Sequence, residues 1–161
     1  MMASEPIGGD PTARSRELID VTVATTVERP VDEVFAFVAD MENEPRWHTD
    51  ILEAERLTEG DVREGTSYRV EFRSQPMSPP EGTVEIVKFE PGRRIVSRSD
   101  MGNMKPKLTH VFDEANGRTK VTRRIQIETS GRMTLMSPVM KVMVRRRNVQ
   151  FLDNLKRLLE C

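Results

Sequence analysis

The sequence has very little of what disulfide-stabilised proteins and membrane proteins need. It contains a single cysteine, Cys161, at the last of its 161 positions. One cysteine excludes an intrachain disulfide, which is typical of proteins from a reducing cytosol. The longest uninterrupted apolar run, Val34–Ala39, is far shorter than the roughly 18 residues that a membrane span needs. We therefore expect a cytoplasmic protein that is not integral to a membrane and is held together by packing alone.

The common motifs of cofactor and metal chemistry are also missing. There is no Gly-rich phosphate loop, no Cys-x-x-Cys pair, no His-x-His and no Gly-x-Ser-x-Gly. With two histidines and one cysteine, a transition-metal site would have to be completed by carboxylates. The formal net charge of -1 provides no global field that would attract nucleic acid. No metal, cofactor or nucleic-acid partner is predicted, and the oligomeric state is left open.

The chain length fits one domain preceded by a short lead-in. The first 17 residues are rich in Pro, Gly, Asp, Ser and Arg, lack the charged-then-apolar pattern of a signal peptide, and are predicted to be disordered. Residues 18–161 carry all of the periodic patterns and are predicted to form a single globular domain.

Alternation and turn signals divide this domain into strands and helices. Residues 18–27 alternate as a strand does, and Pro30 with two acidic residues then begins a helix that ends near Asp40. Residues 40–48 form a loop or a second short helix, and residues 137–160 form a long helix. Between these, turn residues separate six further strands, Ile51–Leu57, Thr66–Ser74, Thr83–Phe89, Arg94–Ser99, Lys107–Phe112 and Thr119–Glu128.

Short links between consecutive strands imply antiparallel neighbours, because a parallel crossover needs a dozen or more residues. The predicted helices stand before and after a run of six consecutive strands and do not alternate with them, which indicates an α+β domain. A seven-stranded antiparallel sheet tends to curl, and the final helix is long enough to lie in the hollow.

Four segments resemble the START-like (SRPBCC) superfamily, in its polyketide cyclase/dehydrase and lipid transport branch. They are V-T-V-A-T-T-V-E-R-P-V-D-E-V-F-A-F-V from residue 21, D-M-E-N-E-P-R-W-H from residue 40, G-T-V-E-I-V-K-F-E-P-G-R-R-I-V from residue 82, and N-G-R-T-K-V-T-R-R from residue 116. The resemblance implies a helix-grip fold, a curved sheet wrapped around the C-terminal helix with a cavity between them. Members bind lipids, hormones or polyketides, and some are cyclases, aromatases or hydrolases. None of the four segments is a catalytic motif.

Two arginines fall on apolar faces. Arg123 shares a strand face with Val121, Ile125 and Ile127, and Arg147 lies in the inner stripe of the final helix. A buried charge needs a partner. Arg123 either points its guanidinium at a carboxylate or carbonyl of a ligand, or makes an internal ion pair, or reaches water. Arg147 either contacts the ligand or extends to solvent at the end of the cavity.

Four aromatic or imidazole side chains are further candidates for ligand contact. His110, on an inward face, is either a general base or a hydrogen-bonded core residue. Tyr68 and Phe72 share a strand face, and the Tyr68 hydroxyl either enters the cavity or packs in the core. Trp47 either gates the cavity or anchors its loop to the core.

Methionine is unusually frequent, with ten in the chain. Three occur in predicted loops (Met77, Met101 and Met104), and four around the start of the final helix (Met133, Met136, Met140 and Met143). Flexible thioethers suit a cavity entrance that adapts to an apolar ligand, although they also fill gaps in ordinary cores. We take Met101, Met136, Met140 and Met143 as candidate ligand contacts.

Three functions are compatible with these features. The first is a carrier or sensor for an apolar molecule such as a lipid or polyketide, with a cavity of about 300–1,000 Å³. The alternative is a cyclase, aromatase or dehydratase, which requires Tyr68, His110, Arg123 and Arg147 to converge. A third is surface binding by the basic face of the final helix, disfavoured because its apolar stripe is expected to be used by the core.

Overall fold

The protein forms one curved sheet with a long helix along its concave side. The computed structural model describes residues 17–73, 80–102, 104–129 and 137–161, so most of the predicted disordered segment lies outside the described residues. The elements follow the predicted order with small shifts at their ends: β1 (Glu17–Val27), α1 (Val31–Ala39), the 3-10 helix η2 (Met41–Arg46), β2 (Ile51–Arg56), β3 (Ser67–Phe72), β4 (Glu81–Glu90), β5 (Arg94–Asp100), β6 (Lys107–Ala115), β7 (Arg118–Thr129) and α3 (Ser137–Glu160).

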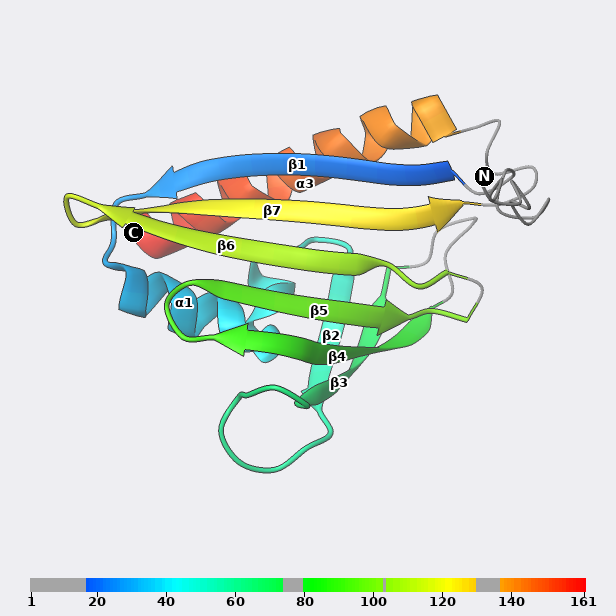
Figure 1. Ribbon diagram of the computed structural model, residues 1–161, viewed down its shortest axis with the longest axis horizontal. Helices are drawn as coiled ribbons and strands as arrows, with labels where there is room; N and C mark the ends of the chain where they lie inside the picture. Colours follow the sequence, from blue (N-terminus) through cyan, green and yellow to red (C-terminus); the bar gives the residue numbers. More distant parts are fainter. Residues whose placement is uncertain (1–16, 74–79, 103, 130–136) are drawn as a thin grey trace, which may run out of the picture.

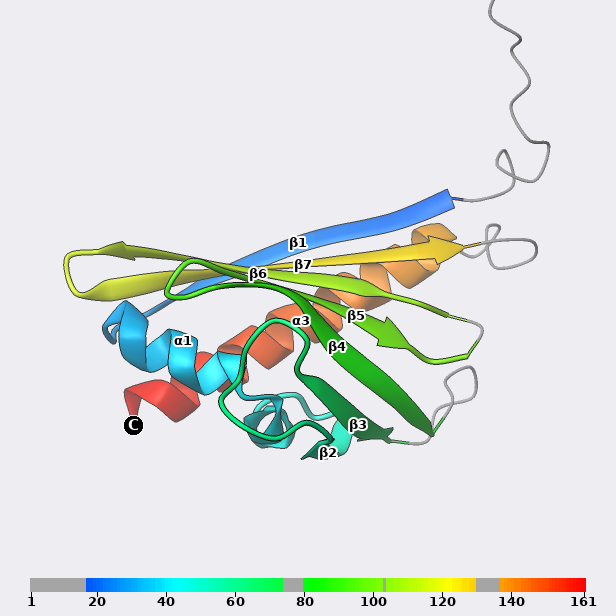
Figure 2. The ribbon, with the colours of Figure 1, turned by 60° about the horizontal axis from the view of Figure 1, so that its bottom comes forward.

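The sheet is antiparallel throughout, in the order β1-β7-β6-β5-β4-β3-β2. Figure 1 shows β1 and β7 running alongside α3, and Figure 2 shows the sheet turning until β2 and β3 lie on the far side of that helix. The predicted α+β helix-grip architecture is confirmed, including two short helices between the first two strands.

The start of the domain follows directly from its sequence pattern. On β1 the inward positions Ile19, Val21 and Val23 are buried, while alternate positions are exposed or half-buried. Pro30 precedes α1. The inner face of α1 carries Phe35, whose ring lies edge-on to two aromatic rings of the sheet, with its centroid 5.3 Å from that of Phe89 and 5.0 Å from that of Phe112. This apolar cluster closes one end of the fold.

The turn between β6 and β7 shows the predicted hairpin chemistry. Asn116 and Gly117 connect the paired residues Ala115 and Arg118, with φ values of 55° and 74°. Two consecutive positive φ angles are what an Asn-Gly hairpin provides. This turn fixes the register of β7, and therefore which of its residues face inward.

The two halves of α3 differ in their surroundings. In the second half Phe151 and Leu155 of the predicted inner stripe are buried in the core, together with Leu152. In the first half Met143 of the predicted stripe is 51% exposed, so the expectation that the whole apolar stripe packs in the core is wrong there. The reason is that the first half of α3 borders a cavity rather than a filled core.

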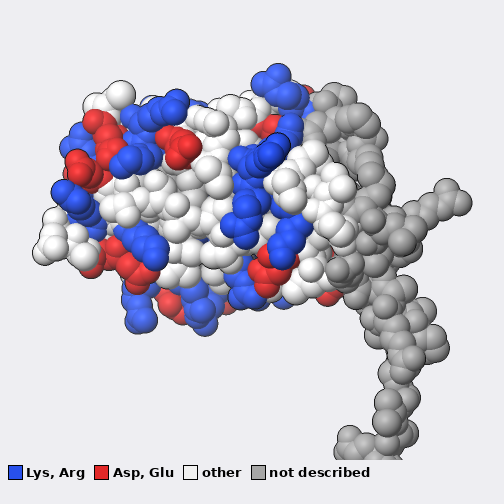
Figure 3. All heavy atoms as spheres, turned by 90° about the horizontal axis from the view of Figure 1, so that it is seen from above, with Lys and Arg blue, Asp and Glu red and all other residues white. Residues whose placement is uncertain are grey.

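Charges of both signs occur on the described surface. Figure 3 shows Lys and Arg interspersed with Asp and Glu over one face, with a band of basic side chains. None of the described helices is long and apolar enough to cross a membrane. A mixed distribution of charge agrees with the small net charge of the chain.

Candidate functional site

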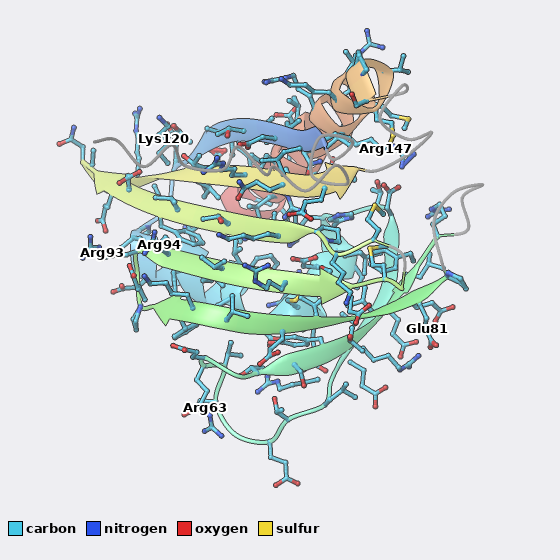
Figure 4. The ribbon with its side chains drawn as sticks, turned by 45° about the vertical axis from the view of Figure 1, so that its right-hand side comes forward. Arg63, Glu81, Arg93, Arg94, Lys120 and Arg147 are labelled. Atoms are coloured by element: carbon cyan, nitrogen blue, oxygen red, sulfur yellow. The ribbon has the colours of Figure 1, made fainter. Side chains whose placement is uncertain are left out.

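A cavity of about 330 Å³ lies between the first half of α3 and one end of the sheet. Figure 4 shows Arg147, which lines the cavity, at the end of the molecule that also carries Glu81, opposite the end with Arg93, Arg94 and Lys120. The strand ends that meet here supply one wall, and η2 with the start of β2 supplies another. The site is therefore at the end of the fold where α3 begins.

Most of the cavity lining is apolar. Strand pairing aligns the inward residues of neighbouring strands, for example Leu108 of β6 opposite Ile125 of β7. The apolar lining side chains of the sheet and α3 include Val70, Phe72, Val84, Leu108, Ile125, Ile127, Met140, Met143, Val144 and Phe151. Such a wall favours an apolar ligand.

Arg123 forms the polar floor of the cavity. Along the inward face of β7, Ile127 and Ile125 line the cavity, Arg123 follows, and Val121 is fully buried in the core. Arg123 Nε donates to Asn148 Oδ1 at 2.8 Å, Nη1 lies 2.9 Å from His110 Nε2, and the guanidinium lies over Trp47, 5.3 Å from the ring centroid. Burial lowers the pKa of Arg123, and the charge of Glu44 opposes this shift.

The contact with Arg123 fixes the state of His110. An arginine N–H can only donate, so His110 Nε2 must accept, and the ring is the neutral tautomer with its proton on Nδ1. Burial, with the nearby Arg123 charge, lowers the pKa of His110 well below its ordinary value. His110 is thus a neutral support for Arg123 that does not line the cavity.

Glu44 is a cavity residue that the sequence interpretation missed. It is only 2% exposed, lines the cavity, and accepts no side-chain hydrogen bond from the residues that the structure describes. Burial raises the pKa of the Glu44 carboxyl, and the charge of Arg123 opposes the rise. The available signal was the spacing of three in the 3-10 helix, which places Met41, Glu44 and Trp47 on one face.

His48 and Asn148 were also missed. His48 follows η2, lines the cavity and stacks on Phe151 with ring centroids 3.8 Å apart. Burial lowers its pKa well below the ordinary value, and the charges of Arg123 and Arg147 act in the same direction. Asn148 lines the cavity from α3 and connects two elements, since its amide nitrogen donates to the Val144 carbonyl at 2.7 Å while its oxygen accepts from Arg123.

The mouth of the cavity carries an ion pair and several methionines. Arg147 Nη1 donates to Asp50 Oδ2 at 2.6 Å, and both side chains line the cavity. Met101 and Met104 of the β5–β6 connection face Met140 and Met143 of α3 across this lining. Arg147 is thus a mouth residue held by the carboxylate of the residue just before β2.

The structure brings together six of the ten side chains predicted to contact a ligand. Phe72, Met101, Arg123, Met140, Met143 and Arg147 line the cavity. Trp47 and Tyr68 instead lie fully buried in the core, and His110 lies beside Arg123 outside the lining. Tyr68 shares a strand face with Phe72, but the cavity occupies only one end of the sheet. Met136, like Met77 and Met133, lies outside the described residues.

The polar set expected of an enzyme does not converge in this arrangement. Arg123 is at the floor, Arg147 is paired with Asp50 at the mouth, and neither Tyr68 nor His110 lines the cavity. Burial, with the nearby Asp40 charge, raises the pKa of Tyr68 to about 12, so its hydroxyl stays protonated at neutral pH. The polar side chains that the described residues place in the cavity wall near Arg123 include Glu44, His48 and Asn148.

Comparison with known families agrees with this architecture. Residues 19–160 match the model of the family described as polyketide cyclase/dehydrase and lipid transport. The chain belongs to this family. A comparison with curated protein sequences found no match.

Solved structures with the same fold include proteins of different kinds. The Zhui aromatase/cyclase from Streptomyces sp. R1128 superposes with a TM-score of 0.72 at 16% identity, covering 89% of this chain and 94% of that one. TTHA0849 from Thermus thermophilus gives 0.69 at 15% identity, with 87% and 96% covered. Ara h 8.0201 gives 0.64 at 16% identity, with 89% and 98% covered. At these identities the similarity establishes the fold of this family member and not its ligand.

Proposed function

We propose that this family member binds an apolar small molecule, such as a lipid or a polyketide, as a carrier or sensor. The observation that carries the proposal is the apolar cavity of about 330 Å³, a volume within the range of small-molecule sites. The few polar groups at its floor and mouth orient a ligand, while the apolar walls provide the driving force by removing its surface from water. Methionines at the mouth allow adaptation to ligand shape.

Native mass spectrometry of freshly purified protein tests the proposal directly. We expect a mass excess that disappears on denaturation, and the released molecule identifies the ligand class. If the protein is ligand-free, a hydrophobic dye should bind the empty cavity and be displaced by apolar compounds. A protein that carries no ligand and binds no such dye would contradict the proposal.

A larger side chain in the cavity wall should weaken ligand binding without unfolding the protein. Ser97 of β5 lines the cavity, and its neighbour Arg98 is exposed on the opposite face of the same strand. We expect Ser97→Phe to weaken dye or ligand affinity at least about tenfold, because the added ring occupies ligand space at a typical overpacking cost of about 1–3 kcal/mol. Isothermal titration calorimetry measures the affinity, and Arg98→Phe is the matched control. Equal affinities of the two variants would place the bound molecule elsewhere.

Glu44 is the observation that favours a second candidate function, a cyclase, aromatase or dehydratase. Its raised pKa lets the carboxyl hold a proton inside an apolar cavity. Protonation of a substrate hydroxyl by this carboxyl would release water, and the resulting carboxylate could take a proton from the neighbouring carbon as the double bond forms. The test is mass spectrometry of the bound molecule after incubation. Loss of the mass of one water with the wild type, but not with Glu44→Gln, would favour this function over the carrier.

A further inference from the structure

The cavity floor contains two polar side chains whose hydrogen-bonding capacity is not used up by the described residues. Glu44 and Arg123 both line the cavity, and they are 2% and 3% exposed. Each shifts the pKa of the other through its charge, so the two groups are near neighbours. No ion pair within 4.0 Å joins them among the described residues, so a gap separates the carboxyl from the guanidinium.

The two sides of this gap are chemically complementary. Arginine has five N–H donors, and the described contacts of Arg123 engage Nε and Nη1, which leaves Nη2 without a described acceptor. The Glu44 carboxyl offers acceptor oxygens and receives no hydrogen bond from the described residues. One side therefore needs an acceptor and the other a donor.

A single hydroxyl satisfies both needs. Its oxygen accepts from Arg123 and its proton is donated to Glu44, each over a normal distance of about 2.7–3.0 Å, which fits a gap wider than a direct ion pair. A ligand carboxylate would bring a second acidic group against Glu44, and an ammonium would bring a second cation against Arg123. A purely apolar ligand that reached the floor would leave these buried polar groups without partners, which is costly, whereas a hydroxyl pairs with both.

We propose that Glu44 and Arg123 form an anchor for an uncharged hydroxyl, an alcohol or a phenol, at the inner end of an otherwise apolar ligand. The anchor rests on the proposed binding function and adds to it the chemical class of the ligand. Arg123 is held in place for this role by Asn148 and His110. Glu44 is held in place by the backbone of η2. Its backbone carbonyl accepts hydrogen bonds from the amide of Trp47 at 3.0 Å and from the amide of His48 at 2.7 Å.

Four probes that share one apolar ring system test the anchor: naphthalene, 2-naphthol, 2-naphthoate and 2-naphthylmethylamine. Their affinities for the wild-type protein are measured by isothermal titration calorimetry at neutral pH. We expect 2-naphthol to bind about 10- to 100-fold more tightly than naphthalene, because each hydrogen bond to a charged or buried partner adds to the affinity. The carboxylate and the ammonium should bind more weakly than 2-naphthol.

A variant of Glu44 separates the anchor from a general polar effect. Glu44→Met should remove most of the preference for 2-naphthol over naphthalene, measured as the ratio of the two affinities, since only the hydroxyl loses a hydrogen-bond partner. Glu42→Met, on the exposed side of the same 3-10 helix, is the matched control and should keep the preference. Glu44→Gln, which preserves shape and an amide oxygen, should give an intermediate preference and covers the case in which Glu44→Met does not fold.

The outcomes distinguish failure of the anchor from failure of the binding function. Equal affinities of naphthalene and 2-naphthol for the wild type would overturn the anchor while leaving the apolar cavity as a binding site. A preference that survives in both Glu44 variants would also overturn it, and would show that other polar atoms of the cavity bind the hydroxyl. If none of the four probes binds, the proposed function and the anchor fall together.

Discussion

Replacing Arg123 with methionine is expected to lower the free energy of unfolding by about 3–5 kcal/mol, the range seen when one partner of a buried charged network is removed. The loss has two causes. Asn148 Oδ1 and His110 Nε2 lose their donor, and each unsatisfied buried acceptor is costly. Glu44 also loses the positive charge that opposes the effect of burial on its pKa. Urea unfolding followed by circular dichroism measures the difference.

The next residue in the chain provides the matched control. Arg124 faces away from the cavity and pairs with Asp20 at 2.6 Å, but its side chain is 48% exposed. Because exposed ion pairs contribute little, Arg124→Met should cost less than about 1 kcal/mol. If the two variants were equally stable, Arg123 would not be the centre of the buried network, and the structural basis for the cavity floor would be wrong.

The contrast between these two arginines also explains how much of the structure the sequence predicts. Alternation along β1 and β7, the Asn-Gly turn and the proline before α1 are local signals, and each one specifies its element without reference to distant residues. The same alternation separates inward Arg123 from outward Arg124. Antiparallel pairing then follows from the short connections, so element order and sheet topology are predictable together.

The cavity itself is harder to predict, because it depends on where the concave side of the sheet is filled. His110 and Arg123 both lie on inward faces and are paired in register, yet only Arg123 lines the cavity. Tyr68 and Phe72 lie on one strand face, and the cavity reaches only Phe72. Strand periodicity gives the face of a residue and not its depth along the sheet, so it cannot separate core from cavity wall.

Glu44 was missed for a different physical reason. Patterns of hydrophobicity treat a glutamate as a surface residue, and a 3-10 helix is too short to show a clear period. Its burial becomes evident only when η2 is packed against the sheet and Arg123 supplies a compensating charge. Buried charges of this kind are functional candidates that sequence patterns alone tend to overlook.

Acidification from about pH 7 to pH 5 is expected to destabilise the protein by about 2–4 kcal/mol, mainly through its two histidines. His48 and His110 have folded-state pKa values well below the ordinary 6.5, and burial is the first cause in both. The unfolded chain therefore binds protons that the folded protein excludes, so stability is fully present above pH 6.5 and is lost as the pH falls below it. If both rings stay neutral to pH 5, linkage gives about 2 kcal/mol for each.

The groups that face these histidines determine the net effect. Arg123 of β7 acts on both rings, whereas Arg147 of α3 and His110 of β6 act on His48 alone. Glu44 works in the opposite direction, since its raised pKa means that the folded state binds more protons than the unfolded state above the ordinary 4.5. This contribution reduces the total over the same interval.

Urea unfolding at a series of pH values, with glutamine replacing one or both histidines, separates these contributions. His110→Gln keeps an acceptor for Arg123 and removes one titration, so about half of the pH dependence should disappear. The double variant H48Q/H110Q leaves no histidine in the chain, and its stability should be constant or rise as the pH falls, because the buried Glu44 carboxyl, with its raised pKa, then dominates the titration in this interval. If the double variant kept the wild-type slope, the histidines would be accessible to protons in the folded state. The conclusion that a neutral His110 positions Arg123 at the cavity floor would then be wrong.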